Sequence, residues 1–111
     1  MGENIFEVRS PLGYIVICSQ VTWEQHVLIG HPVMQGKENE LKSTIEAPDY
    51  IFESEEHPKD RNVYFKYNAL SRKYIKAVTK GDLFIHYIVS AWLQNELKGN
   101  IGGLKYVKHK L

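Results

Sequence analysis

The stretch from Thr22 to Lys80 carries the pattern that decides the predicted fold. It begins with Thr22-Trp23-Glu24-Gln25-His26, a helix-start pattern that ends at Gly30-His31-Pro32. It continues to two short runs in which basic and aromatic residues are interleaved with apolar ones, Asn62-Val63-Tyr64-Phe65-Lys66 and Lys73-Tyr74-Ile75-Lys76-Ala77-Val78-Thr79-Lys80. Because β-branched and aromatic residues are enriched in strands, these runs predict β-strands. The stretch therefore predicts helices followed by a sheet.

The flanking segments extend this order. Residues 4–19 predict a β-hairpin, because Pro11 and Gly13 suit a turn between two apolar runs. Thr22 is the predicted N-cap of a helix over residues 23–29, and a second helix is predicted over residues 37–47. Strands are predicted over residues 50–53, 62–67, 73–80 and 83–93, and the tail from Lys98 is predicted to be a loop.

This order predicts one α+β domain spanning residues 1–111. It comprises an N-terminal β-hairpin (1–19), two helices, a curved antiparallel β-sheet and a basic tail (98–111). The composition agrees, since 43% hydrophobic and 24% charged residues are ordinary for a globular domain. The net charge of +1 neither favours nor excludes a nucleic-acid partner.

Cys18 is the single cysteine, which excludes an internal disulfide and a thiolate-rich zinc site. Its apolar neighbours predict a small buried side chain. No apolar run approaches the roughly 20 residues of a membrane helix, and the first residues lack a signal-peptide pattern. These observations predict a cytoplasmic protein without a membrane partner.

An ordered set of short motifs resembles a known family. The set is Trp23…His26…Gly30-His31-Pro32, Lys42…Thr44-Ile45…Pro48-Asp49-Tyr50-Ile51, Val63-Tyr64-Phe65-Lys66 and Tyr74-Ile75-Lys76-Ala77-Val78. It resembles the phage-associated branch of the barnase–EndoU–colicin–RelE-like (BECR) nuclease superfamily, over about residues 6–107.

The resemblance implies a compact fold of two helices followed by a four-stranded antiparallel sheet, with the hairpin as an addition. It also implies action on RNA without a metal or other cofactor, at the exposed sheet face beside the first helix. A protein inhibitor is a possible partner of such a nuclease.

Two histidines are the leading candidates for proton transfer. Metal-free RNA cleavage needs a base for the 2′-hydroxyl, an acid for the leaving 5′-oxygen and cations near the phosphate. Histidine side chains suit the first two tasks. His31, between Gly30 and Pro32, is the first choice, with a surface or capping histidine as its alternative. His26 is the second, and its alternative is a histidine packed where helix and sheet meet.

Basic and tyrosine side chains on two predicted strands are the candidates for phosphate contact. Alternation places Tyr74 and Lys76 on one face, and Tyr64 and Lys66 on one face of the preceding strand. Pairing these faces predicts a Tyr/Lys surface, with Lys76 and Tyr64 catalytic and Lys66 and Tyr74 binding substrate. An ordinary solvated sheet face is the alternative.

Arg61 is predicted to clamp a phosphate, or else to pair with neighbouring acids. Ser90 is either a site donor or a hydrogen-bonded part of the strand, and Trp92 is interpreted as a core residue. His57 is predicted to face solvent and His86 to be a satisfied sheet histidine. The five histidines lack zinc-site spacing, so no metal is expected.

The resemblance, taken with these candidate residues, implies a metal-independent endoribonuclease of phage or toxin-like origin that cleaves RNA by general acid/base transesterification. The alternative is a catalytically silent RNA- or protein-binding module with the same fold. A third possibility is a small phage accessory protein with no nucleic-acid role.

Overall fold

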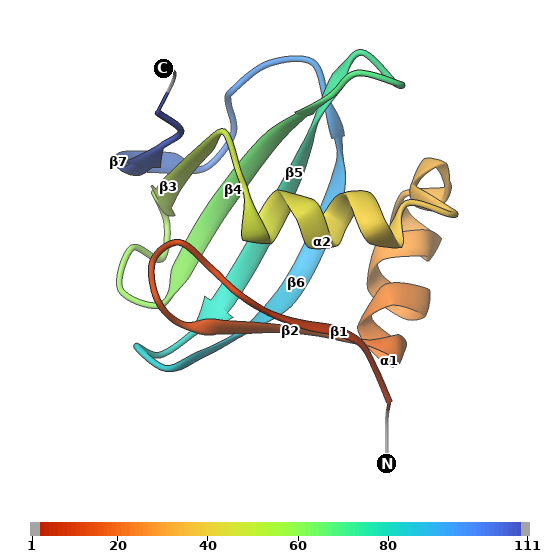
Figure 1. Ribbon diagram of the computed structural model, residues 1–111, viewed down its shortest axis with the longest axis horizontal. Coiled ribbons are helices and arrows are strands. Elements are labelled where there is room, and N and C mark those ends of the chain that lie inside the picture. The colour runs from red at the N-terminus through yellow and green to blue at the C-terminus, as the bar shows by residue number, and fades with distance from the viewer. Residues whose placement is uncertain (1–2, 110–111) are drawn as a thin grey trace.

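The computed structural model describes residues 3–109 and shows an α+β fold (Figure 1). Lys110, part of the predicted basic tail, lies outside the described residues. Seven strands form one sheet in the order β1-β2-β6-β5-β4-β3-β7. The strands are β1 (Asn4–Arg9), β2 (Ile15–Ser19), β3 (Tyr50–Ser54), β4 (Arg61–Asn68), β5 (Lys73–Gly81), β6 (Ile85–Gln94) and β7 (Ile101–Val107).

The predicted fold class is confirmed. The five strands that follow the helices pair antiparallel throughout, from β6 through β5, β4 and β3 to β7. The N-terminal hairpin joins them through a parallel pair between β2 and β6. That single parallel pair makes the complete sheet mixed.

The N-terminal hairpin turns where proline and glycine predict it. The Gly13 amide donates to the Ser10 carbonyl at 2.9 Å, and the Ser10 amide donates to the Tyr14 carbonyl at 2.9 Å. Gly13 has a φ of +101°, a backbone conformation that residues with a Cβ rarely adopt.

The first helix begins earlier than predicted. Helix α1 (Gln20–Thr22) continues into a π-helical segment, η1 (Trp23–Leu28). Ser19 is the N-cap, since its Oγ accepts a hydrogen bond from the Thr22 amide at 3.1 Å. The prediction of Thr22 as N-cap was wrong, because Ser19 is also a good capping residue and lies one turn earlier.

This helical segment ends at the predicted Gly-His-Pro sequence. The His31 amide donates to the Val27 carbonyl at 2.8 Å, and a short 3-10 helix, η2 (Pro32–Met34), follows. Trp23 and Val27 are buried, which anchors the segment against the core.

The second helix agrees with the prediction to within a residue at each end. Helix α2 (Glu38–Glu46) buries Leu41, Thr44 and Ile45. It crosses one face of the sheet in front of β4 and β5 (Figure 1). Its apolar stripe therefore covers the central strands.

One hydrophobic core lies between the sheet, the helices and the hairpin. Its large, fully buried members are Val16, Val27, Met34, Leu41, Ile45, Ile51, Tyr64 and Ile75. Cys18 is buried here as predicted, and burial raises the pKa of its thiol to about 12. Within residues 3–109, no helix has the length and apolar character needed to cross a membrane.

The register between β4 and β5 overturns the predicted Tyr/Lys surface. Phe65 lies opposite Lys76, and Tyr64 lies opposite Ala77. Tyr64 and Lys66 therefore share the face that α2 covers, whereas Tyr74 and Lys76 point to the other face. A shift of one residue in register moves every side chain to the opposite face.

The C-terminal prediction also needs correction. Residues 101–107 form strand β7, which pairs with β3, although a loop was predicted from Lys98. The glycines fit because β7 passes close to Glu53: a Cβ at Gly102 would lie 3.1 Å from the Glu53 Cγ. Small residues permit this approach, so glycine here marks close packing and not a loop.

Candidate functional site

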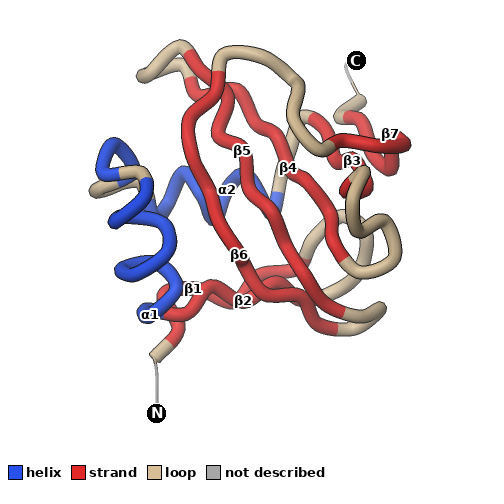
Figure 2. Tube along the Cα trace, turned by 180° about the vertical axis from the view of Figure 1, so that it is seen from behind, coloured by secondary structure: helices blue, strands red, loops and turns tan. Residues whose placement is uncertain are grey.

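Figure 2 views the sheet from the side turned away from α2. The strand register directs several aromatic side chains to this side, and we call it the aromatic face. Cross-strand pairs arrange it in three rows, of which the middle row carries a lysine among aromatic rings. The rows are Ser90-Val78-Val63-Phe52, Trp92-Lys76-Phe65-Tyr50 and Gln94-Tyr74-Tyr67.

Trp92 joins two of the predicted site residues. The His31 ring stacks on the Trp92 indole with centroids 5.3 Å apart. The Lys76 Nζ lies 5.0 Å from the centroid of the same indole and 5.6 Å from that of Phe65. His31, from the loop after η1, and Lys76, from β5, thus meet on one indole.

Lys76 is buried although it carries an ammonium group. Its Nζ donates to the carbonyl oxygens of Lys98 at 2.9 Å and Gly99 at 2.6 Å. Burial lowers the pKa of Lys76 below its ordinary value, because the apolar surroundings disfavour the charged form. Two carbonyls and two aromatic rings compensate for part of that penalty.

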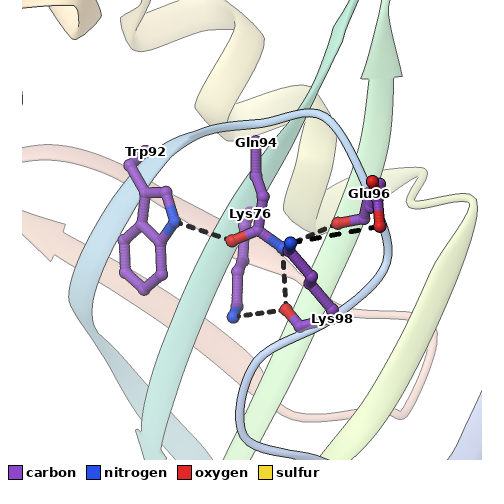
Figure 3. A network of polar contacts seen from close by, with 5 residues as sticks. All are labelled: Lys76, Trp92, Gln94, Glu96 and Lys98. Atoms are coloured by element: carbon purple, nitrogen blue, oxygen red, sulfur yellow. Dashed lines mark hydrogen bonds and ion pairs between the residues drawn. The ribbon is translucent and has the colours of Figure 1, made fainter.

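The connection between β6 and β7 crosses this face and is held by side chains beneath it (Figure 3). Gln94 Nε2 donates to the carbonyls of Glu96 at 2.6 Å and Lys98 at 2.7 Å. Its Oε1 accepts a hydrogen bond from the Trp92 Nε1 at 3.1 Å. Trp92, Gln94 and Lys76 therefore form one network with the backbone of the connection.

A groove of about 620 Å³ continues from the third row of the aromatic face. Tyr50, Tyr67 and Tyr74 line it together with Lys108 and His109. Tyr67 and Tyr74 meet edge to face, with ring centroids 5.6 Å apart. The groove thus combines aromatic rings with Lys108, His109 and the carboxylate of Asp49. Surfaces that stack unpaired bases also pair aromatic rings with basic groups.

The remaining predicted residues on this side are more peripheral. Ser90 is half-buried on β6 and shares the face of Trp92. His26 is exposed on η1, so its alternative as a packed histidine is wrong. The structure therefore brings His31, Lys76, Tyr74 and Ser90 to the aromatic face, with His26 exposed on the adjoining helix.

Tyr64 is not available to a substrate. Its hydroxyl bonds to Ser10 Oγ and to the Tyr14 hydroxyl inside the core. Burial raises the pKa of Tyr64 far above its ordinary value. The prediction that Tyr64 lies on an exposed Tyr/Lys surface was wrong, because its side chain is on the helix face and is fully enclosed.

Two predicted phosphate ligands also lie elsewhere. Lys66 Nζ donates to Ser43 Oγ of α2 at 2.6 Å, so it serves the contact between helix and sheet. Arg61 lines a separate pocket with Asn62 and His86. Lys66 lies on the face that α2 covers, because the predicted pairing of β4 with β5 was one residue out of register. Arg61 stands at the start of β4, beside the separate pocket.

The other histidines match their predictions. His57 is exposed in the β3–β4 loop, and His86 is buried with Nδ1 2.9 Å from Thr79 Oγ1. Among the described residues, no group of three or more His, Cys, Asp or Glu side chains could hold a metal ion.

Two residues of this site were missed. Trp92 was interpreted as core, yet it is half-buried and contacts both His31 and Lys76. Gln94 was not singled out at all. The signal was the period-two spacing of Ser90, Trp92 and Gln94 on one strand, which places all three on one face.

Comparison of the chain with protein-family models, with curated proteins and with solved structures gave no match. The class that the fold and site define is thus an α+β domain with a histidine- and lysine-bearing aromatic sheet face.

Proposed function

We propose that this protein is a BECR-like, metal-independent endoribonuclease whose aromatic face binds single-stranded RNA. The observation that carries the proposal is the meeting of His31 and Lys76 on the Trp92 indole, beside the tyrosine groove. Unpaired bases stack on exposed aromatic side chains such as Tyr67, and the exposed Lys108 of the same groove can attract the phosphate backbone.

In this proposal His31 accepts the proton of the 2′-hydroxyl, whose oxygen attacks the adjacent phosphorus. The bond to the 5′-oxygen breaks, and His26 is the candidate acid that protonates it. The products are a 2′,3′-cyclic phosphate and a 5′-hydroxyl, with no net consumption of protons. Lys76 lends positive charge to the face while its Nζ holds the β6–β7 connection.

The test is incubation of a single-stranded RNA with the protein in EDTA, beside the same sequence carrying 2′-O-methyl groups throughout. The proposal predicts cleavage of the RNA alone, with cyclic phosphate ends. Loss of cleavage on chelation, or equal cleavage of the methylated strand, would contradict it, because the attacking group is then not the 2′-hydroxyl.

A binding module without catalysis is the second candidate. Two of the four predicted catalytic side chains have their polar groups bonded within the protein, namely the Tyr64 hydroxyl and the Lys76 Nζ. Only His26 and His31 then remain for proton transfer, which favours a protein that binds RNA without cleaving it. It predicts RNA binding that weakens as salt rises, without any cleavage product. Product formation in EDTA decides against it.

A further inference from the structure

A polar pocket of about 180 Å³ lies where the β1–β2 turn, the β3–β4 loop and the β5–β6 turn meet. These three connections lie side by side at the lower left of Figure 1 and the lower right of Figure 2. The residues that carry its chemistry are Tyr14, Arg61, Asn62, Asp82, His86 and Lys105. It is separate from the aromatic face.

The wall of this pocket is a fixed network of buried polar groups. Asn62 Nδ2 donates to the Tyr14 hydroxyl at 2.6 Å, and Asn62 Oδ1 accepts from Lys105 Nζ at 3.2 Å. The His86 ring stacks on Tyr14, with centroids 3.8 Å apart and planes 10° from parallel. Tyr14, Asn62 and His86 are each at least nine-tenths buried, so the wall is pre-organised.

The charges around the pocket leave an excess of unpaired cations. Lys59, Arg61 and Lys105 line it, whereas the single ion pair within residues 3–109 joins Lys98 and Glu96. Among the residues that the structure describes, none of the three cations therefore has a carboxylate within 4.0 Å.

Two carboxylates, Asp60 and Asp82, also line the pocket, so its three cations outnumber its acids by one. Asp82 and Arg61 differ in how many of their hydrogen-bonding groups have a partner. The Asp82 carboxylate accepts hydrogen bonds from the amides of Phe84 at 2.7 Å and Ile85 at 2.8 Å, which commits it to its own turn. The Arg61 Nε, in contrast, is buried without a partner among the described residues. An unmet buried donor is costly, so a bound acceptor would stabilise it.

We propose that this pocket binds a phosphate group, with Arg61 and Lys105 as its cationic partners. A guanidinium presents its donors in a planar fork that matches two phosphate oxygens, and Lys105 adds a second positive charge. The volume far exceeds the roughly 10–15 Å³ that one water needs. Inorganic phosphate and the phosphorylated end of an RNA share this chemistry.

The test is NMR of the full chain labelled with ¹⁵N, in which the Arg61 Nε–H is observed directly while inorganic phosphate is added. The proposal predicts a saturable shift of this signal. Arg61→Gln should weaken phosphate binding by about tenfold or more, since it removes charge-assisted hydrogen bonds. Arg72→Gln, at an exposed arginine on the β4–β5 turn, is the matched control and should change nothing.

Two further experiments are needed. One asks whether the bound phosphate group is that of an RNA end, and the other tests the pocket with a variant that does not depend on the folding of Arg61→Gln. A 5′-phosphorylated RNA that binds more tightly than its 5′-hydroxyl counterpart, with the difference lost in Arg61→Gln, assigns the pocket to an RNA end. Lys105→Gln, at an exposed residue, should weaken phosphate binding even where Arg61→Gln perturbs folding. The proposal is overturned if phosphate leaves the Arg61 signal unmoved and neither variant changes binding of either probe. Cleavage is not part of the readout, so failure here leaves the proposed function standing.

Discussion

Lys76 is the residue on which the aromatic face depends most. A buried ammonium is unfavourable unless its hydrogen-bonding capacity is used, and here two carbonyl oxygens and two aromatic rings surround it. The same contacts fasten the β6–β7 connection over the sheet. Lys76 therefore contributes to stability whatever it contributes to chemistry.

Lys76→Met keeps most of the aliphatic side chain but removes the ammonium group that donates both hydrogen bonds. We expect the free energy of unfolding to fall by about 1–3 kcal/mol, because the Gly99 carbonyl loses the Lys76 donor and the Lys98 carbonyl keeps only Gln94 Nε2. Urea unfolding measures this, with Lys80→Met, at an exposed position on the same strand, as the control. Equal stability of the two variants would show that the bonds to the connection contribute nothing.

His86 predicts a specific pH dependence of stability. Burial lowers its pKa, and the charge of Lys105 lowers it further, while the Asp82 carbonyl and the carboxylates of Asp82 and Asp60 oppose the change. The unfolded chain then binds a proton near pH 6.5, whereas the folded chain binds it only at lower pH. Unfolded protein therefore holds more protons in this window, and stability falls as the pH drops from neutrality through it.

The measurement is a series of urea unfolding curves from neutral to mildly acidic pH. His86→Gln should flatten the dependence relative to the wild type, and His57→Gln, at an exposed histidine, should leave it unchanged. A wild-type curve that is flat, or one that His86→Gln does not alter, would refute the assignment.

At the scale of elements, the sequence predicted which segments form strands better than how they pair. The run of basic, aromatic and apolar residues from Lys73 to Lys80 identifies β5 correctly, as Leu41 and Ile45 identify α2. The register of β4 on β5 has no local signal, because Tyr64 and Phe65 are both plausible core residues. The Tyr64 hydroxyl bonds to Ser10 and Tyr14, which are distant in sequence, and these contacts hold Tyr64 on the side of the sheet that the helix covers.

The β5–β6 turn depends on a glycine. A Cβ added at Gly81 would lie 2.0 Å from the Ile85 carbonyl oxygen and 2.6 Å from the His86 Cα, so the backbone would have to move. Gly81→Ala should lower the free energy of unfolding by about 1–3 kcal/mol or more.

Gly30→Ala is the matched control, since a Cβ there meets nothing within 4 Å. It should change stability by less than about 0.5 kcal/mol. Comparable unfolding midpoints for Gly81→Ala and Gly30→Ala would contradict the described turn.

At the scale of the whole molecule, the sequence located the site only in part. His31, Lys76, Tyr74 and Ser90 were predicted and lie on the aromatic face. Trp92, which joins two of them, was missed because a tryptophan in an apolar strand is usually core. Pairing over long sequence separations assembles this surface, and a single sequence does not specify it.

If RNA lies along the aromatic face, replacing an exposed tyrosine by alanine should weaken RNA binding only where that tyrosine lies on this face. Tyr67, 48% exposed, lines the groove, whereas Tyr87, 53% exposed, lies outside it. Tyr67→Ala should weaken single-stranded RNA binding by about 1–3 kcal/mol through lost stacking. Tyr87→Ala should bind like the wild type in a fluorescence anisotropy titration. Equal losses would place the RNA elsewhere.

The most direct test of RNA cleavage at this face is the rate at which single-stranded RNA is cut in EDTA by the double variant His26→Ala/His31→Ala. His57→Ala, at the exposed histidine of the β3–β4 loop, serves as the control. The account predicts that the double variant loses at least about 100-fold in rate, as expected for loss of general acid/base catalysis, while the control keeps the wild-type rate. A folded double variant that cleaves RNA as fast as the wild type would contradict it.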